Sequence, residues 1–235
     1  MSKFYSSIVD YYEKIFEVNS QQIDFLLENN PKTALDIACA TGSTMELLRK
    51  GGVEVTGIDL DPMFVGRAKE KGLDVKVLNM LDLEEEERTF YLVYCIGNSI
   101  AHLEGHNQLE IFLRKAYNKV KEGGELVISF INFEPFLKGK PDEQGLLGNL
   151  PTIEKEGLSF VREYYKEEDH IRFHTILKTN DREIENNERL FPFSKEEVLK
   201  QFEEKGFNKI EVYGSFNKDD FDIEKSMSII IRGIK

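Results

Sequence analysis

The residues best suited to chemistry stand at the ends of two apolar segments early in the chain. The first segment, residues 34–37, runs into the small-residue stretch 38–42 and then into a helix-like pattern. Such a turn brings backbone N–H groups to the carboxyl end of a strand, where open α/β sheets bind ligands. The second segment, residues 53–58, ends at Asp59, whose carboxylate could accept hydrogen bonds from a ribose. The pattern predicts a βαβ unit with a ligand site at one edge; the alternative is a βαβ unit that binds nothing.

These segments resemble the first two motifs of class I S-adenosylmethionine-dependent methyltransferases. The first motif usually reads D-x-G/A-x-G-x-G, and LDIACATGS aligns Asp36, Ala38, Ala40 and Gly42 with its defining positions. Alanine at the first glycine position is common in the small-molecule branch of the family, whereas Ala40 is a rarer departure. The next segment, VTGIDLDPMFVGRAKEKG, is similar to the second motif. A dinucleotide oxidoreductase would show G-x-G-x-x-G, of which only Gly42 is present.

The resemblance implies S-adenosylmethionine as cofactor and S-adenosylhomocysteine as product. Asp59 would then bind the ribose hydroxyls, and the turn at 38–42 the methionyl end. In the family, residues just past the third strand contact the adenine, which makes Asn79 and Met80 candidates; Asn79 could instead be a turn residue that binds its own backbone. The residues expected to bind the cofactor are Tyr12, Asp36, Ala38, Cys39, Ala40, Gly42, Asp59, Leu60, Asn79, Met80, Leu81, Ile96, Gly97 and Ser99.

A second informative stretch, CIGNSIAHL at 95–103, follows the fourth predicted strand. It is similar to a segment of glycine N-methyltransferases and of a wider set of small-molecule methyltransferases. We expect Asn98, Ser99 and His102 to face the transferred methyl group or the nucleophile, because they lie just past the fourth strand, beside the point where the sheet reverses order. Enzymes that methylate base amines or glutamine usually carry [D/N/S]-P-P-[Y/F] here, and the absence of both prolines argues against such substrates. The alternative for His102 is a buried core histidine.

Residues 4–16 carry apolar and aromatic side chains at helical spacing. The positions of Tyr5 and Tyr12 resemble the N-terminal arm of many small-molecule methyltransferases, in which a tyrosine lies over the methionyl part of the cofactor. The resemblance implies that Tyr12 contacts the cofactor and Tyr5 the substrate. Packing of both rings in the core is the alternative.

The composition excludes several classes of partner. A formal net charge of −12 argues against nucleic acid, because binding to phosphates needs a basic surface. The two cysteines are too few for a disulfide framework, and no C-x-x-C pair or H-E-x-x-H segment predicts a metal site. The start lacks the apolar core of a signal peptide, and no run reaches the length of a membrane span. We therefore expect a cytoplasmic monomer or homodimer with no metal, nucleic-acid or membrane partner.

Strand and helix patterns alternate up to residue 133, which predicts a parallel sheet. The alternation then stops. Residues 136–150 have a loop-like composition, and extended segments follow at 151–165, 169–178 and 183–191. Segments this close together pair most easily as an antiparallel meander.

The earlier pattern resumes at Ser194, which forms a capping box with Glu197. The end of the chain looks like the last hairpin of class I methyltransferases. We therefore predict an α/β fold: a Rossmann-like, seven-stranded, mostly parallel sheet with an antiparallel last strand, plus a small antiparallel sheet inserted after the fifth strand. Residues 1–133 and 194–235 would form the cofactor-binding core, and residues 134–193 a subdomain that roofs the substrate pocket.

The inserted sheet should set substrate specificity because it lies above the carboxyl ends of the parallel strands. Its basic residues include Arg162, Arg172, His174 and Arg189, and alternation places Arg172 and His174 on one face. We predict that one of these groups pairs with a carboxylate or phosphate of the substrate, with Arg189 and Arg172 as the first candidates; a solvated surface is the alternative.

The predicted function is S-adenosylmethionine-dependent methyl transfer to a nitrogen or oxygen of a small molecule. The resemblance of the 97–103 segment favours an amino acid or a related amine as acceptor. Two other classes stay open, a non-catalytic S-adenosylmethionine-binding protein and a nicotinamide-dependent oxidoreductase.

Overall fold

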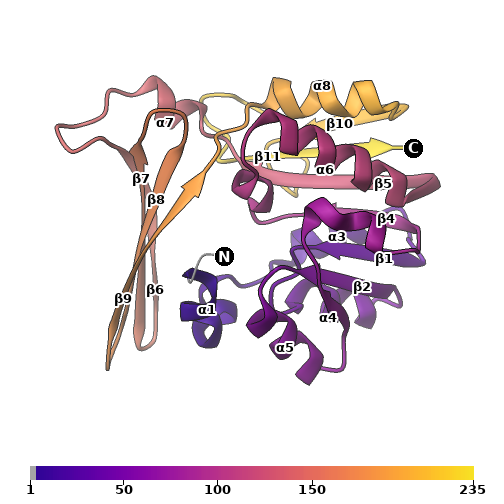
Figure 1. Cartoon of the computed structure of the whole chain (residues 1–235), viewed down its shortest axis with the longest axis horizontal. Helices are drawn as coiled ribbons and strands as arrows, with labels where there is room; N and C mark the ends of the chain where they lie inside the picture. Colours follow the sequence, from indigo (N-terminus) through magenta and orange to yellow (C-terminus); the bar gives the residue numbers. More distant parts are fainter. Residues whose placement is uncertain (1–3) are drawn as a thin grey trace.

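The computed structural model describes the backbone from Phe4 to Lys235 and the side chains from Ser6 onward. Its larger part is a seven-stranded sheet in the order β10-β11-β5-β4-β1-β2-β3 (Figure 1). Strands β1 to β5 pair in parallel, whereas β11 lies antiparallel between β5 and β10. The predicted sheet is confirmed, including its antiparallel last strand. Its strands are β1 (Thr33–Ile37), β2 (Glu54–Asp59), β3 (Asp74–Val77), β4 (Phe90–Cys95), β5 (Val120–Ile131), β10 (Lys209–Tyr213) and β11 (Ser228–Ile234).

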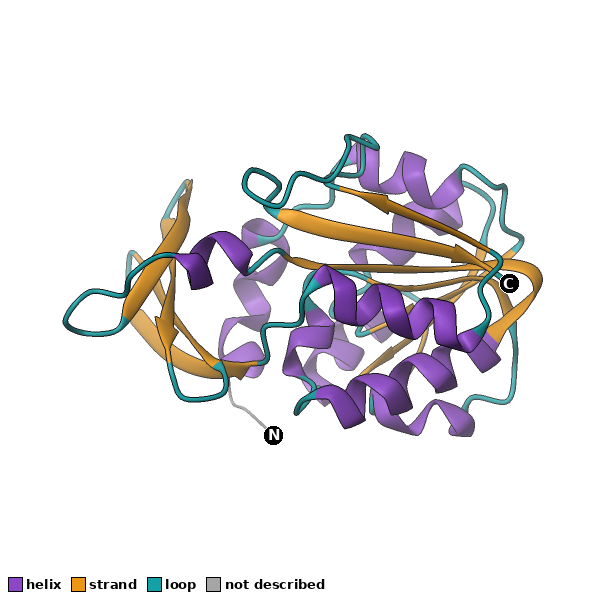
Figure 2. Cartoon of the chain, turned by 90° about the horizontal axis from the view of Figure 1, so that it is seen from above, coloured by secondary structure: helices purple, strands orange, loops and turns teal. Residues whose placement is uncertain are grey.

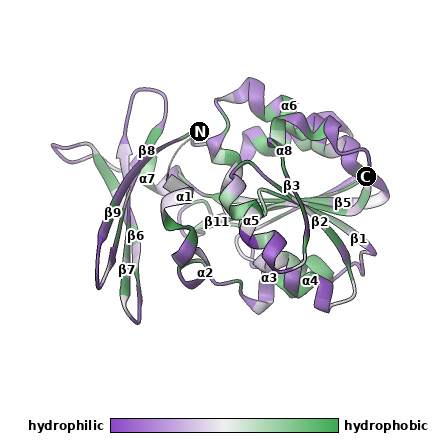
Figure 3. Cartoon of the chain, turned by 60° about the horizontal axis from the view of Figure 1, so that its bottom comes forward, coloured by the Kyte–Doolittle hydropathy of each residue, from purple (hydrophilic) through white to green (hydrophobic). Residues whose placement is uncertain are grey.

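Helices cover both faces of this sheet (Figure 2). On one face, Phe112 and Phe202 pack in the same cluster as Leu35 of β1; on the other, Phe25 and Met45 pack with Ala34. Successive residues of a strand point to opposite faces, so β1 is buried on both sides and reads as a nearly continuous apolar run. The strands are accordingly hydrophobic (Figure 3). The covering helices are α6 (His106–Lys119) and α8 (Lys195–Lys205) on the first face, and α3 (Ser20–Leu27), α4 (Ser43–Lys50) and α5 (Pro62–Glu70) on the second.

A separate antiparallel sheet follows β5 in the chain, in the order β6-β7-β8-β9. The prediction of an inserted antiparallel sheet is confirmed, but the sheet has four strands and not three. A turn at Gly157, with φ at +73°, divides the segment expected as one strand, and the preceding loop-like stretch already contributes the start of β6. The elements are a short helix, α7 (Glu134–Lys138), and strands β6 (Leu146–Lys155), β7 (Leu158–Lys166), β8 (Ile171–Thr179) and β9 (Glu183–Leu190). We refer to this sheet as the roof sheet.

Two apolar clusters attach the roof sheet to the rest of the molecule. At one end, Phe160 and Leu177 pack against Ile8 and Ile15 of the N-terminal segment. At the other end, Tyr164 and the strand ends at 171 and 190 pack against Ala101 and Phe133 beside the larger sheet. The N-terminal segment thus lies between the two sheets (Figure 1).

The N-terminal segment, predicted as one amphipathic helix, is divided into α1 (Phe4–Ile8), the 3-10 turn η1 (Val9–Tyr11) and α2 (Tyr12–Ile15). Its apolar residues serve two surfaces, since Ile8 packs against the roof sheet while Val9 packs with Phe64 of α5. A straight helix would present one stripe to one surface. We attribute the division to this double contact.

The strand order reverses at β1, from which β2 and β3 continue to one side and β4 and β5 to the other. Ligands of open α/β sheets bind outside the carboxyl ends of the strands at such a point. The turn after β1 lies there, and three of its residues adopt positive φ: Ala38 at +63°, Ala40 at +48° and Gly42 at +77°. The motif assigns glycine or alanine to these positions; every residue with a Cβ is strained at positive φ, and of the three only Gly42 lacks one.

Gly42 carries the strongest constraint in this turn. A Cβ added at Gly42 would lie 2.4 Å from Cδ1 of Leu73. Gly72, in the turn after α5, has a similar φ of +70°, but a Cβ there would meet nothing within 4 Å. Gly42→Ala should therefore lower the free energy of unfolding by about 2–4 kcal/mol, as left-handed strain and overpacking add. Gly72→Ala should cost only the strain, about 1 kcal/mol. Denaturant unfolding of both variants checks this, and equal losses would show that the Leu73 contact does not matter.

Candidate active site

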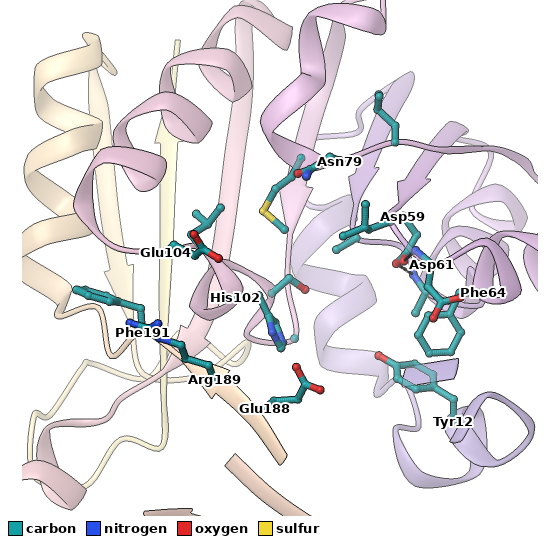
Figure 4. A pocket seen from close by; sticks show the side chains of 18 residues that line it. Tyr12, Asp59, Asp61, Phe64, Asn79, His102, Glu104, Glu188, Arg189 and Phe191 are labelled. Carbon is teal, nitrogen blue, oxygen red and sulfur yellow. Dashed lines mark hydrogen bonds between the residues drawn. The ribbon is translucent and has the colours of Figure 1, made fainter. Parts of the chain in front are cut away.

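A cavity of about 430 Å³ lies at the carboxyl ends of β1, β2 and β4, below the roof sheet (Figure 4). One side is formed by the turn after β1 and the end of β2, and the opposite side by the 3-10 turn η3 (Ser99–His102) and β9. The residues that line it are Tyr12, Ala38, Ala40, Asp59, Leu60, Asp61, Phe64, Leu78, Asn79, Met80, Gly97, Ser99, His102, Leu103, Glu104, Glu188, Arg189 and Phe191.

Asp59 organises the side of the cavity that is formed by the turn after β1 and the end of β2. One carboxylate oxygen accepts a hydrogen bond from the backbone N–H of Ala40 at 2.8 Å, and the other accepts one from the N–H of Asp61 at 2.9 Å. Burial raises the pKa of the Asp59 carboxyl, and the two N–H donors partly counter this rise. Because a carboxylate oxygen has two lone pairs, both oxygens can still accept hydrogen bonds from a ligand.

Three of the expected cofactor-binding residues do not line the cavity. Asp36 is buried, accepts a hydrogen bond from the Tyr94 hydroxyl at 2.9 Å, and has a pKa raised to about 8 by burial. Cys39 packs in the apolar cluster of α4 and β2, and its thiol donates to the carbonyl of Ala40 at 3.8 Å. Gly42 caps α4 and leaves the cavity wall to Ala38 and Ala40. The side chains of Asp36 and Cys39 therefore support the turn from within the core, and the cofactor contact expected of these two residues stays a prediction.

The loop after β3 contributes two of its three expected residues. Asn79 and Met80 line the cavity, whereas Leu81 packs against the larger core. The Asn79 side chain accepts a hydrogen bond from the N–H of Leu81 at 2.9 Å and so caps the 3-10 turn η2 (Met80–Glu85). Asn79 is therefore a turn residue that binds its own backbone, and it also lines the cavity where the adenine contact is expected. Leu60, at the end of β2, lines the cavity as expected.

The segment after β4 places Gly97, Ser99 and His102 at the cavity, but not Asn98. Asn98 has a φ of +71°, and its side chain accepts a hydrogen bond from the N–H of Ile131 at 3.0 Å. This bond ties the segment to the end of β5 and gives Asn98 a structural contact, while the catalytic role expected of Asn98 stays a prediction. Ile96 likewise points into the core beside α3 and α4.

His102 and Glu188 end close to one another on the side of the cavity that faces the roof sheet (Figure 4). Burial lowers the pKa of His102 to about 4, so its imidazole is neutral at pH 7. Burial raises the pKa of Glu188 to about 7. Perturbed values of this kind cluster at functional sites. The sequence did not identify Glu188, since a glutamate in a polar alternating strand gives no signal until the strand's inward face is known.

Of the two arginines predicted to bind substrate, only Arg189 lines the cavity, at its exposed rim. Its guanidinium pairs with Asp169 at 2.8 Å. Arg172 lies outside the cavity, where it pairs with Glu167 at 3.1 Å and covers the ring of Tyr165 at 4.0 Å from the centroid. The substrate role predicted for Arg172 is therefore withdrawn, because its guanidinium already has partners on the outer face of the roof sheet.

Tyr12 lines the cavity beside the turn after β1, with its ring centroid 4.7 Å from that of Phe64. The predicted contact with substrate falls on the Tyr5 side chain, which lies outside the described residues. Phe64, Phe191 and Leu103 were missed in the sequence, where each looks like an ordinary core residue. None of the helices that the structure describes is long and apolar enough to cross a membrane.

Comparison with known proteins supports a methyl-transfer site. Residues 34–124 match the methyltransferase domain family. The chain is similar to the glycine/sarcosine/dimethylglycine N-methyltransferase of Actinopolyspora halophila, with 23% identity over 91% of this chain and 38% of that protein. The glycine/sarcosine N-methyltransferase of Parasynechococcus marenigrum is 23% identical over 92% of this chain and 80% of that protein. The chain thus spans well under half of the first relative and most of the second.

Solved structures agree in fold. An S-adenosylmethionine-dependent methyltransferase from Clostridium acetobutylicum superposes with a TM-score of 0.80, at 17% identity over 98% of this chain and 99% of that one. A sugar N-methyltransferase from a Streptoalloteichus species gives a TM-score of 0.72, at 20% identity over 100% of this chain and 94% of that one. The domain match, this fold and a cavity at the switch point together support a class I S-adenosylmethionine-dependent methyltransferase that acts on small molecules.

The linkage between Asp59 and the turn predicts a loss of cofactor affinity when the carboxylate is replaced. Asp59→Asn keeps the size of the side chain but has only one acceptor oxygen, so one of the two backbone N–H groups loses its partner. We expect S-adenosylmethionine to bind about 1–3 kcal/mol more weakly by calorimetry. Asp82→Asn, in η2 outside the cavity, is the matched control. Unchanged affinity in a folded Asp59→Asn variant would contradict the assignment.

The lowered pKa of His102 predicts an acid-dependent contribution to stability. Between the unfolded value of 6.5 and the folded value of about 4, the unfolded chain binds the proton and the folded chain does not. The free energy of unfolding is therefore unaffected by this histidine above pH 6.5. It falls as the pH drops from 6.5 towards 4, by at most about 1.4 kcal/mol per pH unit. His102→Gln should flatten the denaturation profile in this window. Parallel profiles for the two proteins would mean that His102 titrates normally.

Proposed function

We propose that this chain transfers the methyl group of S-adenosylmethionine to an amine nitrogen of a small molecule. The observation that carries the proposal is that the two ends of the cavity are lined by different kinds of residue. The small-residue turn and Asp59 stand at one end, and neutral His102 and Glu188 stand at the other. A cofactor site and a site for an amine therefore adjoin in one cavity.

The residues present fit the cofactor. Ala38 and Ala40 present only a methyl group each to the cavity, which leaves the backbone of the turn accessible. In our proposal the turn holds the methionyl end, Asp59 and Leu60 the ribose, and Asn79 and Met80 the adenine. Tyr12 covers the methionyl end from the N-terminal segment. Ser99 and Gly97 then lie next to the reacting group.

The chemistry asks little of the protein beyond alignment. When bound, S-adenosylmethionine supplies an electrophilic methyl carbon, and the C–S electron pair stays on a neutral thioether as the N–C bond forms. Holding the nitrogen in line is the main contribution, worth up to about 7–11 kcal/mol in favourable systems. An amine that enters as an ammonium ion must first lose a proton. The Glu188 carboxylate is placed to take it, because its pKa of about 7 is matched to neutral pH.

Relatives with N-methyltransferase names support nitrogen as the acceptor atom. They include the two glycine and sarcosine enzymes and an N,N-dimethyltransferase of a dTDP-amino sugar from Streptomyces fradiae, which is 27% identical over 77% of this chain. Relatives named for ubiquinone O-methylation are aligned over a smaller part of the chain, 53% in one example. We further propose a cytoplasmic monomer or homodimer, a location consistent with two free buried cysteines.

The test is a turnover screen with methyl-labelled S-adenosylmethionine and a panel of small amines, amino acids, amino sugars and catechols. Transfer to at least one amine, with none to catechols, is the expected result. Transfer to catechols alone would replace nitrogen by oxygen as the acceptor atom. Tight cofactor binding without transfer to any compound would favour the non-catalytic binding protein.

Kinetics of a His102 variant test the assignment of the reacting end. His102→Ala should lower kcat by about tenfold or more while the affinity for S-adenosylmethionine changes less than threefold, because the ring faces the acceptor and not the ribose. His174→Ala is the matched control, since His174 pairs with Glu163 and Glu185 outside the cavity. A variant that loses only thermal stability would show that His102 is a core histidine.

A further inference from the structure

The inward face of the roof sheet is apolar except along one short strip. Side chains that alternate with the exposed ones include Phe160, Tyr164, Ile171 and Leu177, each at most 1% exposed. The strip interrupts them with Arg162, Thr175, Asn186 and Glu188. The strand register aligns Arg162 with Thr175, and Thr175 with Asn186, in one row across β7, β8 and β9. Glu188 lies two residues further along β9 on the same face.

The strip lies between the two clusters that attach the roof sheet. Phe160 and Leu177 belong to the cluster on the N-terminal segment, whereas Tyr164 and Ile171 belong to the cluster beside the larger sheet. The polar row therefore crosses the sheet between the two clusters, next to Phe173, which packs against both. Glu188 lines the cavity, so the strip begins at the cavity wall, and its other members lie further from the cavity.

Two buried polar atoms of the strip have no hydrogen-bond partner among the described residues. Thr175 is 1% exposed, and its Oγ1 has no hydrogen-bond partner. The buried Nε of Arg162 also has none, while its Nη2 donates to the carbonyl of Pro151 at 2.7 Å. Burying such groups without partners is unfavourable, and native proteins seldom do so without a reason.

Arg162 also differs from the other two arginines on the strands of the roof sheet in its charge partners. Arg172 pairs with Glu167, and Arg189 pairs with Asp169. Arg162 has no ion pair with any carboxylate of the described residues, although burial lowers its pKa. A guanidinium remains charged in proteins and favours a planar or tetrahedral oxyanion as partner.

We propose that Arg162 and Thr175 form an anion-binding subsite for the acceptor, and that the amine of the same molecule lies at Glu188. The proposal rests on the proposed N-methyl transfer and narrows its substrate class to amines that carry a carboxylate, phosphate or sulfate. Arg162 Nε and Thr175 Oγ1 donate to the anion, and the Glu188 carboxylate accepts from the ammonium group. Asn186, whose side chain donates to Ser7 of α1, closes the row at the N-terminal segment.

The register also limits the length of the acceptor. Arg162 and Glu188 are separated by two inter-strand spacings, with β8 between them, and by two residues along the strand, which puts their Cα atoms about 12 Å apart. Both side chains project from the same face, so the groups they bind lie several bonds apart. Acceptors with a spacer of several carbons between amine and anion should therefore be better substrates than α-amino acids.

The experiment compares charged amines with their neutral analogues in the intact protein. Arg162→Gln should raise KM about tenfold or more for an ω-amino acid and an aminoalkyl phosphate, but leave KM for the corresponding amino alcohol and the affinity for S-adenosylmethionine unchanged. Arg172→Gln, on the outer face, is the matched control and should change none of these. The two charged substrates distinguish a carboxylate from a phosphate. Equal KM values for charged and neutral amines in wild type and Arg162→Gln would overturn the subsite.

Thr175→Val provides a second variant whose folding is secure, because it replaces an unpartnered hydroxyl by a methyl group of similar size. It should raise the midpoint of thermal unfolding and also raise KM for the charged amines, a combination that a purely structural threonine would not give. Binding of acetate, phosphate and sulfate by calorimetry tests the subsite without turnover. If anions bind to wild type and not to Arg162→Gln, while no amine is methylated, the subsite stands and the proposed function fails. If amines are methylated but neither variant changes KM, the proposed function stands and the subsite fails.

Discussion

The Asp59 carboxylate joins the ends of two neighbouring strands, and the geometry of the active site depends on this link. It accepts one hydrogen bond from the turn after β1 and one from the turn after β2, at 2.8 and 2.9 Å. The turn after β1 places alanines at positive φ, a conformation that costs free energy and persists only where the surroundings hold it. The N–H of Ala40 is held by Asp59, and Gly42 is fixed by the close approach of Leu73. One buried acidic group therefore maintains the shape of the cofactor end.

A second layer of buried polar groups supports that link from below. Asp36 carries a pKa of about 8 and accepts a hydrogen bond from Tyr94, so a protonated carboxyl and a phenol lie under the turn. A neutral Asp36 avoids placing a second negative charge beside Asp59 in a medium of low dielectric constant. The acidic residue of the first motif thus contributes by being uncharged.

Much of the fold and part of the site could be predicted from the sequence. The cofactor end follows from local signals: small residues where φ is positive, and an acidic residue where a strand ends. Asn98 shows why other residues could not be placed, because its partner is the backbone of Ile131, far along the chain. The placement of Glu188 and Arg172 could not be predicted, because it depends on which face of the roof sheet points inward. Alternation divides a strand into two faces, but only packing against the N-terminal segment decides which one is buried.

The two ends of the inserted segment leave and rejoin the larger sheet close together. The N–H of Phe191, just past β9, donates to the carbonyl of Ala101 at 2.7 Å, while the end of β5 is tied to Asn98 in the same loop. An insertion with adjacent ends can vary in length and sequence without disturbing the frame that carries it. The residues between β5 and α8 can therefore be exchanged as one unit while the seven-stranded sheet keeps its structure. The new segment must keep the hydrogen bond to Ala101 and the apolar residues that pack against the N-terminal helices.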